Sequence, residues 1–181
     1  MKFYTSDLHL DHANMLKFEP ESRPFLNVEE MNETIIQNWN AKVKPGDEVY
    51  ILGDFCFDTD GSRTNQFLKR LNGRKYLIKG NHDHFLKGKN FDKSLFEWIK
   101  DYAVIKDNDN VVVLFHYPIA VWDRKHHGAI HLYGHIHSNK DDHHPMTYDL
   151  GNAYNVGVDV QDMEPKTLEE ITNGKIRGKI R

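Results

Sequence analysis

The sequence predicts a mixed α/β sandwich, and two features of its patterning carry that prediction. Short apolar, β-branched or aromatic segments alternate with amphipathic helical patterns in the first half of the chain, and strand-like sequence dominates the second half. The segment Val111–Phe115 is apolar throughout, which is typical of a strand buried on both faces. Strands are expected over Lys2–Ser6, Glu48–Leu52, Lys75–Lys79, Ala103–Lys106, Val111–Phe115, Ile130–Tyr133 and Asn155–Val158.

Helices are expected between these strands. Asn27 is a suitable N-cap, Glu30 completes a capping box, and an apolar stripe at spacings of three and four follows until Pro45-Gly46. Further helices are expected over Thr64–Leu71, Phe91–Lys100 and Leu168–Thr172. The run of Asp and Asn at residues 107–110 predicts a tight turn, so the strands on either side of it are expected to form a hairpin.

The length and composition fit one compact domain. The chain has 181 residues, of which 39% are hydrophobic and 28% charged, so it is long enough to bury a core. We expect a single domain over residues 1–173. Residues 174–181 form a basic tail in which Gly-Lys-Ile-Arg occurs twice. A solubilising end is the favoured interpretation of this tail, and an arm for phosphate-rich partners is the alternative.

Charge, cysteine content and hydropathy exclude several classes of protein. The formal net charge of −3 gives no support to a nucleic-acid substrate, although that alternative stays open. The single cysteine, Cys56, excludes an internal disulfide framework. No apolar run reaches the roughly 18 residues of a membrane span, and Asp7 interrupts any signal-peptide core. A cytoplasmic protein without a membrane partner, either a monomer or a homodimer, is therefore expected.

Polar side chains follow five of the expected strands, where ligand sites of α/β sheets collect. These blocks are Asp7-Leu8-His9, Gly53-Asp54, Gly80-Asn81-His82-Asp83, His116 and Gly134-His135-Ile136-His137. In extended backbone, residues two apart point to the same side, so Asp7 and His9 are expected to face one point, as are His135 and His137. The glycines before the polar groups allow sharp turns and close approach of a ligand.

The donor types in these blocks predict a metal site. Oxygen and imidazole donors together suit Mn, Fe, Co, Ni or Zn better than calcium. Asp7, His9, Asp54, Asn81, His116, His135 and His137 are too many for one tetrahedral zinc, whereas two ions that share a bridging carboxylate would use them all. Two adjacent metals serve in-line displacement at phosphorus. His82 is then a spare imidazole suited to protonating the leaving group, with Asp83 as its orienting carboxylate.

In this order, the blocks make the chain similar to the calcineurin-like metallophosphoesterase superfamily. The resemblance spans residues 7–137 and implies a four-layer αββα sandwich of two mixed sheets flanked by helices. It implies that one metal is held by Asp7, His9 and His137, the second by Asn81, His116 and His135, and both by a bridging Asp54. It also matches His82 to the catalytic histidine of the family, which contacts the phosphate.

The chain departs from one branch of that superfamily. In the protein Ser/Thr phosphatases the second block continues into Asp-Arg-Gly, whose arginine binds phosphate, and Gly53-Asp54 here is followed by no such tripeptide. The chain also leaves little length for a cap domain. It most resembles the small bacterial and phage phosphoesterases, whose substrates do not transfer by analogy.

The sequence thus predicts a hydrolase of phosphate esters that uses two divalent transition metal ions, with Mn favoured. A metal-bound hydroxide would attack, and His82 would act as general acid. Phosphodiesters are favoured because the resemblance places His135 where diester-cleaving members have a histidine. A phosphomonoesterase is the alternative, followed by a catalytically silent scaffold. The expected partner is a small-molecule or nucleotide-like phosphate ester.

Loop residues near the blocks are expected to contact the substrate. Asn14 and Arg23 follow the first block, and Arg23 could supply a bidentate donor to phosphate. His127 lies between two blocks, on a loop that could overhang the metals. Packing or solvation of these loops is the alternative interpretation for all three residues.

Overall fold

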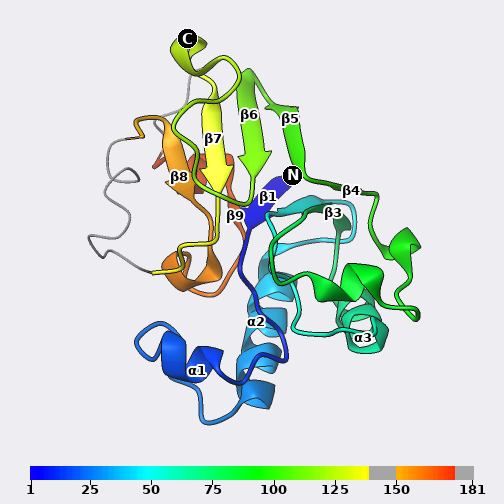
Figure 1. Cartoon of the computed structure of the whole chain (residues 1–181). Coiled ribbons are helices and arrows are strands. Elements are labelled where there is room, and N and C mark those ends of the chain that lie inside the picture. The colour runs from blue at the N-terminus through cyan, green and yellow to red at the C-terminus, as the bar shows by residue number, and fades with distance from the viewer. Residues whose placement is uncertain (139–149, 174–181) are drawn as a thin grey trace.

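The computed structural model describes residues 1–138 and 150–173, so the basic tail at 174–181 lies outside the described residues (Figure 1). One sheet has the order β4-β3-β2-β1-β9, formed by Trp98–Lys100, Arg74–Ile78, Glu48–Ile51, Lys2–Thr5 and Lys166–Thr167. The other has the order β5-β6-β7-β8, formed by Tyr102–Asp107, Asn110–Phe115, Ile130–Tyr133 and Ala153–Asn155. Each contains one antiparallel pair, β1–β9 or β5–β6, among parallel pairs, so both sheets are mixed as expected.

Side chains alternate between the faces of the first sheet and so build two layers of core. Phe3, Val49 and Leu77 pack in one core with buried residues of α2 (Val28–Lys42) and α3 (Ser62–Arg70). The alternate residues of β1, β2 and β3 pack between the two sheets with residues of β6 and β7, namely Tyr4, Tyr50, Ile78, Val112, Leu114 and Leu132. Burial of these apolar faces holds the sheets together and brings their strand ends to one edge.

The outer face of the second sheet has its own smaller core. Val113 and Tyr133 pack there against Trp122 and Leu150, which lie on the segments beside the sheet. The 3-10 helix η3 (Lys125–His127) follows Trp122, whose indole donates to the carbonyl of Ala129 over 3.0 Å. In the described part of the chain this layer consists of short turns, so it is thinner than the helical layer on the first sheet.

The predicted start of the long helix is confirmed with one change. The side chain of Asn27 accepts a hydrogen bond from the amide of Glu30 over 2.9 Å. The carboxylate of Glu30 accepts from the amide of Leu26 rather than from that of Asn27, so the reciprocal half of the capping box is displaced by one residue. The remaining helices are α1 (Met15–Phe18) and α4 (Leu168–Ile171), and the remaining 3-10 turns are η1 (His84–Lys87), η2 (Lys93–Leu95) and η5 (Val158–Val160).

The helix predicted over Phe91–Lys100 is wrong. This segment forms η2 and then β4, which pairs with β3 in parallel. The Trp98 ring lies 5.3 Å from that of Tyr76 across the pair, so aromatic cross-strand packing outweighs the weak helical pattern. The strand predicted at Asn155–Val158 is also displaced, because β8 ends at Asn155 and η5 begins at Val158. Among the described residues, no helix has the length and apolar character needed to cross a membrane.

Candidate metal centre

The blocks of polar residues meet where the parallel strands of the two sheets end. Asp7 follows β1, Asp54 follows β2 and Asn81 follows β3 in the first sheet. His116 follows β6, and His135 follows β7, in the second. Since the two sheets pack face to face, these ends converge at one edge of the sandwich.

The convergent side chains form two groups of ligand atoms. Within the first, the ligand atoms of Asp7, His9 and His137 lie within 4.8 Å of one another, and the same holds for Asp54, His116 and His135 in the second. Asp54, a member of the second group, also approaches the first, because its Oδ2 atom is 3.5 Å from Nε2 of His9 and 3.6 Å from Nε2 of His116. His135 and His137, expected to face one point, therefore belong to different groups.

Hydrogen bonding around His116 leaves its second nitrogen facing acceptors. Nδ1 of His116 lies 2.7 Å from the carbonyl oxygen of Leu52, which can only accept, so this nitrogen carries the proton. Nε2 then presents a lone pair 3.0 Å from Oδ1 of Asn81 and 3.6 Å from Oδ2 of Asp54. Three electron-pair donors that converge without a proton between them fit a divalent cation.

Burial also leaves the first group with an electron-pair donor that suits a divalent cation. Nε2 of His9 is buried and has no hydrogen-bond partner, although an imidazole nitrogen in that position ordinarily has one. Burial lowers the pKa of His9, which keeps the ring neutral and its lone pair available. Burial also raises the pKa of Asp7, a shift that a bound cation would reverse by stabilising the carboxylate. Both groups thus fit metal ions in their donor types, and in the first group Nε2 of His9 has no hydrogen-bond partner of its own.

Five of the candidate ligands have left-handed backbone, which few residues other than glycine adopt. The φ angles are 57° at Asp7, 48° at His9, 54° at Asp54, 73° at His135 and 50° at His137. The expectation that Asp7 and His9 sit on extended backbone is therefore wrong, and successive sharp turns bring them together instead. Hydrogen bonds between loops hold these turns, including Asp7 N–H to Gly53 O at 3.0 Å and His9 N–H to Asp54 O at 2.9 Å. Strain of this kind collects at functional sites.

Two of the glycines are required by close approach. Gly53 has φ of 95°, and a Cβ there would lie 2.5 Å from Nδ1 of His116. A Cβ on Gly134 would lie 2.0 Å from Oγ of Ser6 and 2.4 Å from Oδ2 of Asp7. The loops that carry the candidate ligands therefore pack at distances that only glycine permits.

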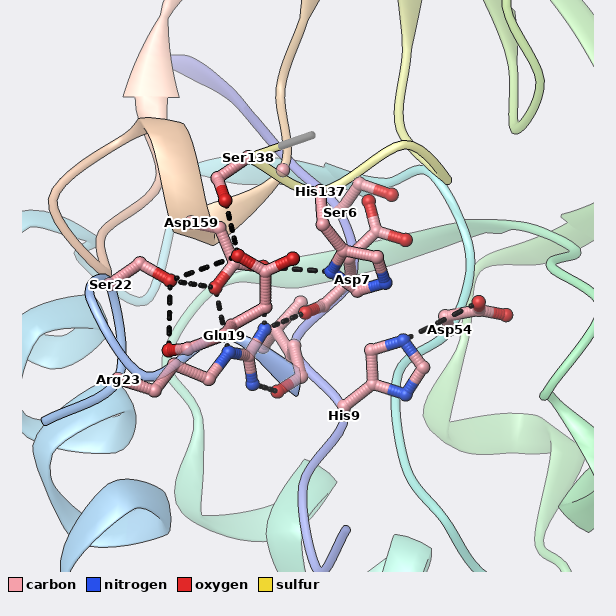
Figure 2. Close-up of polar contacts among 12 residues, drawn as sticks. Ser6, Asp7, His9, Glu19, Ser22, Arg23, Asp54, His137, Ser138 and Asp159 are labelled. Carbon is pink, nitrogen blue, oxygen red and sulfur yellow. Dashed lines mark hydrogen bonds and ion pairs between the residues drawn. The ribbon is translucent and has the colours of Figure 1, made fainter. Parts of the chain in front are cut away.

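A buried carboxylate, that of Asp159, orients His137 from behind (Figure 2). Oδ2 of Asp159 lies 2.9 Å from Nδ1 of His137, and the guanidinium of Arg23 donates to both carboxylate oxygens over 2.7 and 2.9 Å. Burial raises the pKa of Asp159, but the hydrogen bonds from Arg23 and His137 outweigh it and hold the pKa well below its usual range. Because this ionised carboxylate accepts the Nδ1 proton, Nε2 of His137 is left to face the first group.

Arg23, expected to contact the substrate, is buried instead. Its exposed fraction is 1%, and its five N–H donors point to Asp159, to the carbonyl oxygens of Asp7 and Leu8, and to the sulfur of Met31. No donor is left for phosphate in this structure. Asp159 was not predicted as a functional residue, although it directly follows the strand expected over Asn155–Val158, as Asp7 and His116 directly follow theirs.

His82 and its neighbour Asp83 lie beside the two groups in different ways. The half-buried ring of His82 is 5.4 Å from that of His9, and its backbone N–H donates to Oδ1 of Asp54 over 2.8 Å. Asp83 is buried, and its carboxylate accepts the backbone N–H groups of Asp54, Phe55 and Gly80 over 3.2, 2.8 and 2.8 Å. Burial raises the pKa of Asp83 to about 6. Its oxygens therefore fix the loops around Asp54, in place of the expected orientation of the His82 ring.

Two aromatic rings, those of Phe57 and Tyr117, lie near the groups. Phe57, 47% exposed, stacks on His12 with ring centroids 4.0 Å apart. The ring of Tyr117 lies 4.5 Å from that of His135. Asn14 is exposed before α1 and His127 is exposed in η3, and neither belongs to the two groups, so their contacts with substrate stay predictions.

Comparison with known proteins assigns the chain to a family. The family model described as calcineurin-like phosphoesterase matches residues 3–96. An uncharacterized protein of Methanocaldococcus jannaschii is 35% identical over 179 residues, which cover 98% of this chain and 93% of that protein. This chain belongs to the calcineurin-like phosphoesterase family. A crystal structure of a protein of unknown function from Aquifex aeolicus aligns with a TM-score of 0.75 and 28% identity, and covers 96% of this chain and 98% of that one.

Membership of the calcineurin-like phosphoesterases confirms the resemblance and the fold predicted from the sequence. The family match contains Asp7, His9, Asp54, Asn81 and His82, which come from the first sheet. The second sheet supplies its candidate ligands from beyond the match, namely His116, His135 and His137. The similarity to the Methanocaldococcus protein extends over almost the entire chain. It therefore includes the candidate ligands from the first sheet and those from the second.

Proposed function

We propose that this chain is a dinuclear metal-dependent phosphoesterase that hydrolyses phosphodiesters. The observation that carries the proposal is the position of Asp54, whose Oδ2 atom faces one imidazole of each group, His9 at 3.5 Å and His116 at 3.6 Å. Asp54 would bridge two ions. One would be held by Asp7, His9 and His137, and the other by Asn81, His116 and His135. Mixed oxygen and imidazole donors suit Mn²⁺, with Fe, Co, Ni and Zn as alternatives.

The chemistry divides between the ions and the chain. When bound, the ions supply Lewis acidity toward the phosphoryl oxygens and toward the attacking water. His82 belongs to neither group, and its half-exposed ring beside His9 can approach a leaving oxygen and give it a proton. Asp54 accepts the backbone N–H of His82 over 2.8 Å, so the bridging carboxylate also sets the position of the proton donor.

The openness of the site supports a diester substrate. Asn81 is exposed and His82 is half-buried at the rim. The described elements are the two sheets and the turns and helices that flank them, with no cap domain among them. A phosphate with two substituents therefore has room at this edge. A monoester is the alternative, and the relative turnover of the two substrate types decides between them.

The test uses protein stripped of metal and then titrated with Mn²⁺. We expect Mn²⁺-dependent hydrolysis of bis-p-nitrophenyl phosphate that exceeds hydrolysis of p-nitrophenyl phosphate. Substitution His82→Ala is expected to slow turnover by roughly 10²–10⁴-fold, the usual contribution of a general acid, whereas the exposed His126→Ala serves as the matched control and keeps full activity. Faster cleavage of the monoester would overturn the diester preference, and full activity in His82→Ala would remove His82 from the mechanism.

A further inference from the structure

We infer that the cavity beside Asn81 binds a second phosphate group of the substrate, next to the phosphodiester that is cleaved. The cavity has a volume of about 620 Å³, and its lining residues come from the end of β3, from β4 and from the turns η1 and η2. This inference rests on the proposed function, because it names the class of substrate that would occupy the same site.

The cavity borders the candidate metal centre through Asn81. Gly80 and Asn81 line it, and Oδ1 of Asn81 is 3.0 Å from Nε2 of His116 in the second group. A substrate whose scissile phosphate lies at the two groups would therefore extend its next chemical group past Asn81 into this space. The cavity is thus placed to select among substrates rather than to take part in the cleavage.

The charge of the lining is positive, in contrast to the chain as a whole. Lys79, Lys87, Lys93 and His84 line the cavity, whereas the chain has a net charge of −3. Within the parts of the chain that the structure describes, Lys87 and Lys93 have no carboxylate within 4.0 Å. Two ammonium groups at one cavity are therefore free to pair with an anion, and lysine binds phosphate as a point charge.

The third lysine is only weakly engaged. Lys79 pairs with Asp101 over 3.0 Å, and the two side chains are 41% and 78% exposed. An ion pair this exposed contributes little free energy, so a phosphate can replace the carboxylate of Asp101 at small cost. Lys79 precedes Gly80 directly, which places it closest in sequence to the metal centre.

One carboxylate also lines the cavity, and its contacts turn it toward the protein. Asp83 is 5% exposed, and its oxygens accept the backbone N–H groups of Asp54, Phe55 and Gly80. The positive ends of these three N–H dipoles point at the carboxylate and partly offset its negative charge. Three lysines and one engaged carboxylate therefore leave the cavity attractive to anions.

Apolar side chains complete the cavity and refine the class of ligand. Leu86 and Ile99 line it beside the lysines, so an organic group attached to the phosphate can pack there. A nucleotide diester that carries an additional phosphate combines both features. We therefore assign the cavity to substrates of that class, of which a 5′-phosphorylated dinucleotide is the simplest.

The test compares the dinucleotides pTpT and TpT, which differ in the 5′-phosphate, with Mn²⁺-loaded protein. The value of kcat/KM for pTpT is expected to exceed that for TpT by about tenfold or more. This is the usual contribution of a hydrogen bond between charged groups, here between a cavity lysine and the 5′-phosphate. In the double variant Lys87→Gln/Lys93→Gln this ratio is expected to fall close to unity. The matched control, Lys17→Gln/Lys106→Gln, changes two exposed lysines that do not line the cavity, and keeps the ratio of the wild type.

A binding measurement separates failure of this inference from failure of the proposed function. Titration calorimetry of the loaded protein should give thymidine 3′,5′-bisphosphate an affinity at least about tenfold above that of thymidine 5′-monophosphate, with the difference lost in the cavity double variant. Hydrolysis of both dinucleotides at equal efficiency, with equal binding of the two nucleotides, overturns the cavity assignment and leaves the phosphodiesterase intact. Absence of all turnover, with the binding difference retained, overturns the proposed function alone.

Discussion

Nδ1 of His137 donates a hydrogen bond over 2.9 Å to Asp159, and the same carboxylate pairs with Arg23 at 2.7 Å. Arg23 in turn donates to the carbonyl oxygens of Asp7 and Leu8. A single chain of buried contacts therefore joins the first ligand loop to the last candidate ligand (Figure 2). It fixes the proton on Nδ1 of His137, so that Nε2 faces Asp7 and His9.

Substitution Asp159→Asn should weaken Mn²⁺ binding at the first group. The amide has one acceptor oxygen where the carboxylate has two, and it lacks the charge that holds the proton on Nδ1 of His137. Loss of such a supporting contact typically lowers metal affinity by about 10–100-fold. Equilibrium dialysis against Mn²⁺ measures this, and one of the two binding steps should weaken.

The matched control for that variant is Asp162→Asn. Asp162 is 83% exposed and pairs with Lys166, so its loss should leave both Mn²⁺ affinities unchanged. Equal weakening in Asp159→Asn and Asp162→Asn would show that charge alone, and not the orientation of His137, governs binding.

Substitution Gly134→Ala should disturb the first group through sterics. The added methyl would lie 2.0 Å from Oγ of Ser6 and 2.4 Å from Oδ2 of Asp7, so both side chains must move. Overpacking of this kind costs about 1–3 kcal/mol in free energy of unfolding, and displacement of Asp7 should also reduce Mn²⁺ occupancy. Gly46→Ala is the control, because nothing lies within 4 Å of a Cβ there. Urea unfolding and metal analysis report the two effects, and an unperturbed Gly134→Ala would refute the close packing of these loops.

His131 should make the stability of the protein depend on pH. It is fully buried, and burial lowers its pKa from 6.5 to about 4. As the pH falls from about 6.5 to about 4, the unfolded state takes up the proton first, so the free energy of unfolding falls. Above this window the ring is neutral in both states, and its contribution is fully present.

The size of the effect follows from the shift of the pKa. At about 1.4 kcal/mol per unit, the wild type should lose on the order of 3 kcal/mol across the window. Urea unfolding of metal-free protein should show that His131→Leu lacks this part of the pH dependence, whereas the exposed His126→Leu retains it. Identical pH dependence in the wild type and His131→Leu would mean that the imidazole takes up its proton equally in both states.

Asp83 should stabilise the loops around Asp54 and should not orient the ring of His82. The variant Asp83→Asn can accept fewer of the three backbone N–H groups, and one donor left unpaired costs about 1–3 kcal/mol of stability. A double-mutant cycle with His82→Ala tests the pathway, because independent sites give additive losses. A coupling energy well above about 0.5 kcal/mol in unfolding free energy would restore the role of Asp83 as a partner of His82.

Local patterns in the sequence were sufficient to predict most elements of the fold. The strands that precede the ligand blocks and the helix that begins after Asn27 follow from apolar periodicity and capping, which depend on near neighbours. Phe91–Lys100 failed because its structure depends on pairing with β3, a contact that no local pattern encodes. The family resemblance supplied the arrangement of the two sheets, and the structure confirms it.

The candidate metal centre, like the fold, could be predicted from the sequence only in part. The candidate ligands could be found because each follows a strand, and the structure brings them together as two groups. The structural role of Arg23 could not be predicted, because an arginine before Pro24 looks like an exposed loop residue, and only the fold brings it to the carboxylate of Asp159, 136 residues away. The left-handed backbone at Asp7 and His9 was equally hidden, since the hydrogen bonds that hold it come from another loop.

Electron paramagnetic resonance of the Mn²⁺-loaded protein tests whether Asp54 bridges two ions. Two Mn²⁺ ions that share one carboxylate interact magnetically, so we expect two ions per chain with an exchange-coupled spectrum. In Asp54→Ala the coupled signal should disappear and metal should be lost from both groups. A wild-type spectrum of isolated Mn²⁺, or retention of two coupled ions in Asp54→Ala, would show that Asp54 does not bridge the two groups.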